Sequence, residues 1–230
     1  MADGMTQRTT SATIDAAIDA RAMLKHGFYR AWSEGRLNQA ILADYAKQYF
    51  HHVEAFPRAV SAVHTACPDR AGRRMLAENL AEEEGLGEGK SDHAALWMDF
   101  ANGIGADEGS VRSAKLNPET VGLIDAFRTL TAKSYAAGLG ALYAYESQLP
   151  AVASTKIVGL DRFYGVNDEN VIRFFTVHEA ADVEHAQVCR DLIDALPADQ
   201  RAQAQEGAEK LAEALLGFLS GVEREAGMSC

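Results

Sequence analysis

The stretch from Val171 to Leu196 carries one stripe of side chains that predicts a long helix. The members of the stripe recur every three or four residues: Val171, Phe175, His178, Asp182, His185, Cys189, Leu192 and Leu196. Residues with this spacing lie on one face of an α-helix. Because most of them are apolar, the stripe is expected to face the core of the protein.

The rest of the chain also divides into helical blocks. Asn38 is a good N-cap for a long helix that Pro57 should kink, and a helical stretch is expected over 117–149. Further helices are expected over 13–25, 28–33, 69–84, 150–160 and 168–196, the last with Asn167 as its N-cap. Two more are expected to begin after Ser91 and after Pro197. Hairpin signals and repeats are lacking. The sequence predicts one all-α domain over 11–226 behind a loose tail at 1–10.

Charge and cysteine content exclude several classes of protein. The chain has 22 Lys and Arg against 33 Asp and Glu, a net charge of −11, which argues against a nucleic-acid or anionic-membrane partner. Its three cysteines form no CxxC pair, so neither a disulfide framework nor a thiolate zinc site is expected. Because neither a signal peptide nor a membrane span is recognisable, we expect a cytoplasmic protein.

Two imidazoles and a carboxylate interrupt the apolar stripe. His178 and His185 are two turns apart, roughly 10 Å along the axis, with Asp182 between them. This separation is too long for one metal ion but suits two neighbouring ions. A network of hydrogen bonds in the core would explain the same pattern, so this helix alone leaves both interpretations open.

Three other helices place a possible ligand on an apolar face. These residues are Glu146, His93, and either Glu83 or Glu84, since both acidic residues follow Leu80 by about one turn. Each has an ordinary structural explanation, but four helices with the same anomaly favour a metal site. Three imidazoles and three carboxylates suit two divalent ions such as iron or manganese better than zinc. The carboxylates would nearly offset the charge of two such ions.

Several motifs resemble one known family. The most specific are Tyr-Glu-Ser-Gln at 145–148 and His-Glu-x-Ala-Asp-Val-x-His-Ala at 178–186, with further matches at 26–29, 45–47 and 55–57. On these residues the chain resembles the CADD-like proteins, named for association with death domains. They belong to the heme-oxygenase-like proteins that include TenA and PqqC.

The resemblance implies a fold, a metal site and an activity. The fold would be a seven-helix bundle, commonly a homodimer. The site would hold two iron ions, or manganese and iron, on Glu83, His93, Glu146, His178, Asp182 and His185. The activity would be formation of para-aminobenzoate with O₂ and an external reductant. By the same resemblance, Tyr29 would supply the ring and Lys156 the amino group, whereas Tyr45 and Tyr145 would relay electrons or be alternative targets.

Two other functions remain open from the sequence. One is a TenA- or PqqC-like hydrolase or oxidase acting on an external small molecule, in which a hydrolase would need a nucleophile such as Cys189. The other is a death-domain-type interaction protein. Neither accounts for six potential ligands on core faces, so the sequence favours the dimetal oxygenase, with O₂ and a small-molecule product as its partners.

Overall fold

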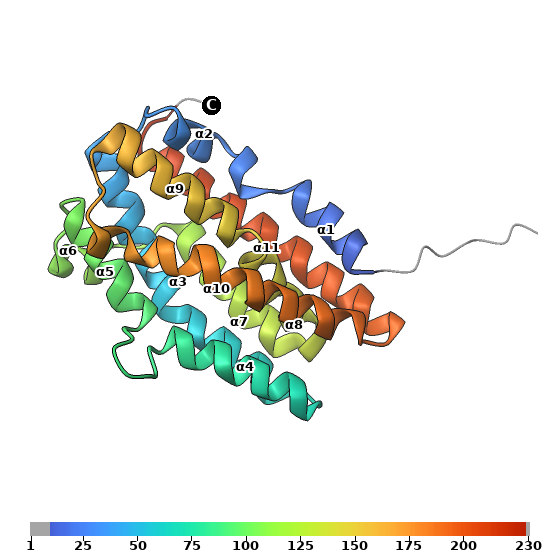
Figure 1. The fold of residues 1–230 in the computed structure, drawn as a ribbon. Helices are drawn as coiled ribbons and strands as arrows, with labels where there is room; N and C mark the ends of the chain where they lie inside the picture. Colours follow the sequence, from blue (N-terminus) through green and yellow to red (C-terminus); the bar gives the residue numbers. More distant parts are fainter. Residues whose placement is uncertain (1–9, 229–230) are drawn as a thin grey trace, which may run out of the picture.

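The computed structural model describes residues 10–228, and all regular structure in this range is helical (Figure 1). The helices are α1 (Ser11–Asp19), the 3₁₀ helix η1 (Met23–Lys25), α2 (Gly27–Ser33), α3 (Gln39–Ala66), α4 (Arg70–Glu83), α5 (His93–Gly103), α6 (Glu108–Arg112), α7 (Pro118–Lys133), α8 (Tyr135–Glu146), α9 (Leu149–Tyr164), α10 (Glu169–Asp194) and α11 (Ala198–Glu225). The predicted all-α class is confirmed. Most of the predicted tail lies outside the described residues, but Thr10 is the N-cap of α1.

Two of the expected helices are interrupted. The stretch 117–149 breaks at Ser134, which is extended (φ −168°, ψ 160°) and accepts a hydrogen bond from the backbone N–H of Ala137, so that α8 starts anew. The helix expected over 13–25 ends at Asp19. The backbone N–H of Met23 instead donates to Oε1 of Gln148 at 2.8 Å. Both predictions were wrong because a side chain competes for the backbone groups that would continue the helix.

Aspartates, not their neighbours, cap two of the predicted helices. Asp92 accepts from the N–H of Ala95 and starts α5, where Ser91 was expected. Asp168 likewise caps α10 in place of Asn167. The N-cap predicted at Asn38 is confirmed, because its side chain accepts from the N–H of Ile41. These caps satisfy backbone donors that have no partner within the helix.

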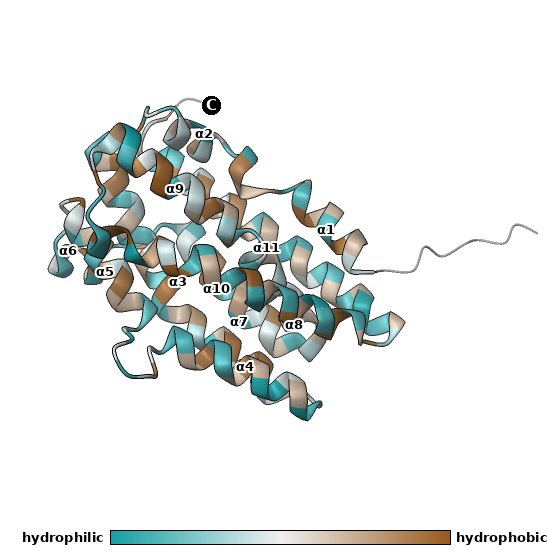
Figure 2. Cartoon of the chain, in the orientation of Figure 1, coloured by the Kyte–Doolittle hydropathy of each residue, from teal (hydrophilic) through white to brown (hydrophobic). Residues whose placement is uncertain are grey.

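Helix α10 crosses the middle of the bundle and packs against α4, α5, α8 and α9 (Figure 1). Most helices in Figure 2 carry both hydrophobic and hydrophilic segments, as expected for elements with one buried face. The buried stripe of α10 therefore meets α4, α5 and α8, the three helices that carry the other predicted ligands. Within residues 10–228, none of the helices is both long enough and apolar enough to cross a membrane.

Helices α8 and α11 lie unusually close together. A Cβ atom at Gly140 would collide with the carbonyl oxygen of Ala204, and one at Gly207 would collide with that of Ala137. The two backbones can approach this closely only because glycine has no side chain. The contact fixes α8, whose last residues are Tyr145 and Glu146.

Candidate metal centre

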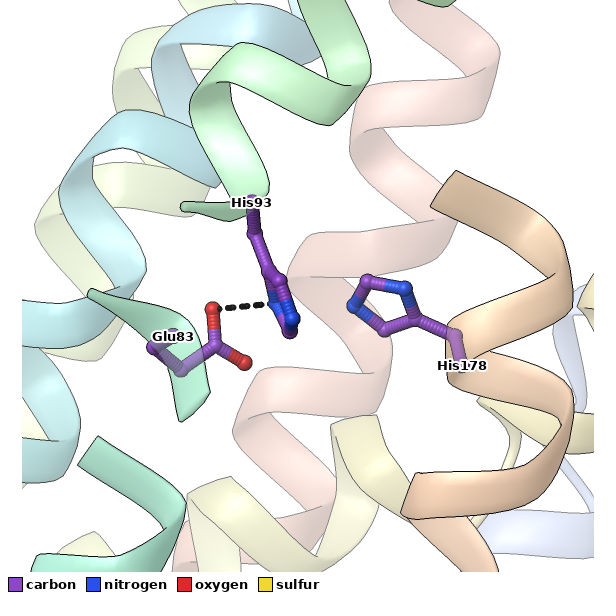
Figure 3. A group of neighbouring side chains, drawn as sticks. All are labelled: Glu83, His93 and His178. Atoms are coloured by element: carbon purple, nitrogen blue, oxygen red, sulfur yellow. Dashed lines mark ion pairs between the residues drawn. The ribbon is translucent and has the colours of Figure 1, made fainter. Parts of the chain in front are cut away.

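Three buried side chains from three helices converge near the middle of α10. Glu83 ends α4, His93 begins α5 and His178 lies within α10; each offers one ligand atom, and these atoms all lie within 4.8 Å of one another. Figure 3 shows the carboxylate of Glu83 facing the ring of His93, with His178 opposite. Oε2 of Glu83 lies 2.8 Å from Nδ1 of His93. This is the spacing at which residues can share one metal ion.

The turn after α4 selects Glu83 over its neighbour. Glu84 is the exposed C-cap of α4, whereas Glu83 is 4% exposed. Gly85 then adopts a positive φ of 65°, and a side chain there would collide with the backbone of Asp92. This turn brings the end of α4 against the start of α5, which places Glu83 beside His93. Of the two carboxylates left open by the sequence, only Glu83 reaches the cluster.

His178 is held in a form that can bind a metal. Its Nδ1 donates to the carbonyl oxygen of Phe174 at 2.6 Å, which leaves Nε2 as the ligand atom. Burial, together with the nearby charge of His93, lowers the pKa of His178 well below its usual value. The ring is therefore neutral, as a metal ligand must be.

The other three predicted ligands form an adjoining buried group. Nδ1 of His185 lies 3.4 Å from Oδ1 of Asp182. Burial raises the pKa of Asp182 to about 6 and that of Glu146 to about 7. Burial would lower the pKa of His185, but Asp182 and Glu146 raise it to about 9. The structure thus brings these three together next to the first cluster, although only Glu83, His93 and His178 form a ligand-spaced group among the described residues.

Two polar neighbours of this centre, Asn79 and Glu82, were not among the predicted site residues. Asn79 donates to Oε1 of Glu146 at 2.6 Å, and Oε2 of Glu82 lies 3.1 Å from Nε2 of His185. Asn79 lies one turn before Glu83 on α4, a spacing that could have indicated it. Glu82 is only partly buried and had no such signal.

The residues present fit a pair of divalent cations. Nδ1 of His93 makes no aligned hydrogen bond despite its proximity to Glu83, and Oδ2 of Asp182 has no partner among residues 10–228. Buried polar atoms are costly without a partner, and a carboxylate more so. Oxygen and imidazole donors in this number suit iron or manganese. Metal ions bound at this centre would satisfy both orphaned atoms.

A second buried cluster surrounds the amine of Lys156. This side chain is 2% exposed, its Nζ lies 2.5 Å from the hydroxyl of Tyr45, and six aromatic ring centroids lie within 5.9 Å of it, among them Tyr29 at 5.7 Å. Burial lowers the pKa of Lys156 well below its usual value. No carboxylate within the described part of the chain pairs with it. Burial without a counter-charge thus favours the neutral form of the amine, which carries a free lone pair.

Tyr49, which sequence analysis did not single out, connects the two clusters. Its ring stacks on that of Tyr45 at 5.6 Å, and its hydroxyl lies 2.7 Å from the hydroxyl of Tyr145. Burial raises the pKa of Tyr49 and Tyr145, and the charges of Glu83 and Asp182 raise both further. The charges of both carboxylates thus act on the two phenols. The four-residue spacing from Tyr45 was the available sign.

Comparison with known proteins identifies the family of this chain. The model of a family described as iron-containing redox enzymes matches residues 43–223. The chain belongs to this family. A 4-aminobenzoate synthase from Nitrosomonas europaea is 38% identical to this redox enzyme over 95% of the chain and 92% of its own length.

Solved structures confirm the fold of this iron-containing redox enzyme. A protein of heme oxygenase-like fold from Shewanella denitrificans superposes with a TM-score of 0.79 at 17% identity, covering 95% of this chain and 92% of its own. A CADD-like protein from Nostoc punctiforme gives a TM-score of 0.78 at 17% identity, covering 94% and 96%. The heme-oxygenase-like bundle expected from the resemblance is confirmed.

Proposed function

We propose that this redox enzyme forms 4-aminobenzoate in an O₂-dependent reaction, with Tyr29 as the source of the ring and Lys156 as the amino donor. The similarity to a 4-aminobenzoate synthase over nearly the whole chain supports the reaction. Its product is a ring that carries an amine. The observation that carries the assignment is a neutral amine buried among aromatic rings, one of them Tyr29.

Two metal ions, either both iron or manganese with iron, would be held by the six predicted ligands. When bound, they would supply oxidation by O₂, and an external reductant would restore their reduced state. The ligands are Glu83, His93, Glu146, His178, Asp182 and His185. Asn79 and Cys189 orient Glu146 by donating to its two oxygens, at 2.6 and 3.2 Å. The backbone carbonyl of Phe174 orients His178 by accepting a hydrogen bond from its Nδ1.

The phenols between the two clusters can move an electron and a proton together. A protonated phenol must release its proton when it is oxidised, and the raised pKa of Tyr145 keeps its proton in place until then. Because Tyr49 is itself a protonated phenol hydrogen-bonded to Tyr145, it could take this proton only while passing its own to a base, such as the carboxylate of Glu83 or Asp182. From Tyr49, the stacked ring of Tyr45 continues to the amine of Lys156.

A thiol-dependent hydrolase is disfavoured. Cys189 is buried, and burial and the charge of Glu146 raise its pKa well above the usual value. A thiol is nucleophilic only as its thiolate, and this one donates to Oε2 of Glu146. Cys189 therefore supports a ligand better than it would attack a substrate.

Isotope labelling tests the source of the product. The protein is produced with ¹³C-labelled tyrosine and ¹⁵N-labelled lysine, loaded with Fe(II) or with Mn(II) and Fe(II), and exposed to reductant and O₂. We expect 4-aminobenzoate that carries both labels, and a chain whose intact mass shows loss of most of one tyrosine side chain. Peptide mapping should assign the loss to Tyr29.

Three variants make this test specific. Tyr29→Phe and Lys156→Met should form no product, because each removes a donor. Tyr164→Phe is the matched control, since this half-buried tyrosine also lies beside Trp32 but donates only to a backbone carbonyl. Unlabelled product from the labelled chain would show that the ring comes from an external molecule, and product from Tyr29→Phe would refute the assignment of this residue.

A further inference from the structure

A cavity of about 280 Å³ lies between α3 and α7, outside both clusters described above. His52 lines it, and the ring of His52 also contacts the rings of Tyr49 and Tyr145, with centroids 5.1 and 4.9 Å away. The cavity is therefore one side chain away from the tyrosine pair. Small-molecule sites usually span ~300–1,000 Å³, and a cavity of ~150 Å³ can hold benzene. The space thus suits a ligand with a single ring.

The walls of this cavity are shaped for a flat ring. The imidazole of His52 and the ring of Phe127 are stacked, with centroids 5.3 Å apart and planes inclined by 20°, and Phe56 adds a third ring. Ala59 and Ala62 of α3 also line the cavity, and their small side chains leave room for a ligand. Aromatic rings pack favourably against each other in offset or edge-on contacts.

Charge at the cavity favours an anion. Among residues 10–228, the cavity is lined by no carboxylate but by Arg58 and Arg128, which are both exposed. Arg128 is paired with Asp125 at 3.0 Å, but Arg58 has no ion pair with any of residues 10–228. Inside, Nε2 of His52 has no hydrogen-bond partner in the same range, and burial lowers the pKa of His52 to about 3, so its ring is neutral. The cavity thus combines an apolar interior with an unneutralised guanidinium.

We propose that this cavity binds a single-ring aromatic carboxylate, whose ring packs against His52 and Phe127 and whose carboxylate pairs with Arg58. The ligand class follows from the lining residues alone. 4-Aminobenzoate belongs to this class, and its choice as the natural ligand rests on the proposed function. Bound there, the product would contact the ring of His52, which in turn contacts Tyr49 and Tyr145.

Titration of the metal-free protein, followed by calorimetry, tests the ligand class. We expect benzoate and 4-aminobenzoate to bind with a stoichiometry of one per chain. Benzyl alcohol has the ring without the charge and should bind about tenfold more weakly, which corresponds to about 1.4 kcal/mol. Cyclohexanecarboxylate has the charge without the flat ring and should also bind more weakly.

Two variants locate the site. Arg58→Gln should weaken benzoate binding about tenfold, whereas Arg74→Gln, at an exposed arginine of α4 that does not line the cavity, should leave it unchanged. Ala62→Phe fills the cavity from a half-buried position and should abolish binding. The thermal melting of each variant shows whether it is folded.

Several results would overturn the proposal. The first is that benzoate does not bind at millimolar concentrations. The second is that benzoate binds folded Ala62→Phe as tightly as it binds the wild type. The third is that benzyl alcohol binds the wild type as tightly as benzoate does. If Ala62→Phe instead changed the oligomeric state in sedimentation, the face would be an interface between copies, which also overturns it. Labelled 4-aminobenzoate formed by a protein that does not bind benzoate would refute this site alone, and binding without product formation would refute only the proposed function.

Discussion

Replacing Lys156 by methionine should change how the stability of the protein depends on pH. Burial lowers the pKa of Lys156 in the folded state well below its usual value. In the unfolded chain the same amine is solvated and has a pKa of roughly 10.4. Between these two pKa values the unfolded chain holds a proton that the folded chain has lost. The free energy of unfolding of the wild type therefore decreases as the pH falls through this window.

The magnitude follows from the linkage between protonation and folding. Each pH unit below roughly 10.4 costs the wild type about 1.4 kcal/mol, as long as the folded amine stays neutral. A methionine side chain carries no titrating proton in either state and avoids this cost. The Lys156→Met variant should thus gain stability relative to the wild type by about 1.2 kcal/mol between pH 10 and pH 9. Loss of the contact from Nζ to Tyr45 is common to all pH values and does not affect this slope.

Urea denaturation of the metal-free proteins at several pH values measures the slope. Lys115→Met is the matched control, because the same substitution there removes an exposed amine instead of a buried one. Its difference from the wild type should not grow as the pH falls. A difference between wild type and Lys156→Met that is independent of pH would mean that the buried amine is charged. The role of Lys156 as a neutral amino donor would then be refuted.

Four further outcomes are expected. His178→Ala should lower the iron bound per chain, as measured by elemental analysis. Tyr49→Phe should retain that iron but slow formation of 4-aminobenzoate, because Tyr145 loses its hydrogen-bonded partner. Relative to Glu146→Gln, the metal-free wild type should lose stability in urea as the pH rises from roughly 4 to 7, because Glu146, with a pKa near 7, holds a proton that the unfolded carboxyl releases. Gly140→Ala should cost about 1–3 kcal/mol in the same assay, since its Cβ would meet α11.

The helical class and the stripe on α10 could be predicted because they depend on local periodicity. Phe175, His178, Asp182, His185 and Cys189 are all buried, as the three- and four-residue spacing indicated. One helix position determines which neighbours share its face, so no long-range information was needed. The same argument identified His93 and Glu146, which are also buried.

Contacts between distant segments were beyond the sequence pattern. The choice of Glu83 over Glu84 depends on the turn at Gly85 and on the backbone of Asp92 against it. The break before Met23 depends on a side chain 125 residues away, Gln148. Neither partner is visible from local periodicity, because a pattern of apolar residues does not specify which side chain fills a given gap.

The buried polar residues explain why one region of the core departs from the rest. Asp182 and Glu146 could be replaced by apolar residues of similar size without loss of a helix, and the fold would avoid the cost of burying two carboxylates. Their raised pKa values show that burial already disfavours their charged forms in the metal-free chain. A bound metal cation would favour those charges in that position. These buried carboxylates are therefore the strongest indication of metal-dependent chemistry in this bundle, and Lys156 is the complementary case of a buried amine whose charged form is disfavoured.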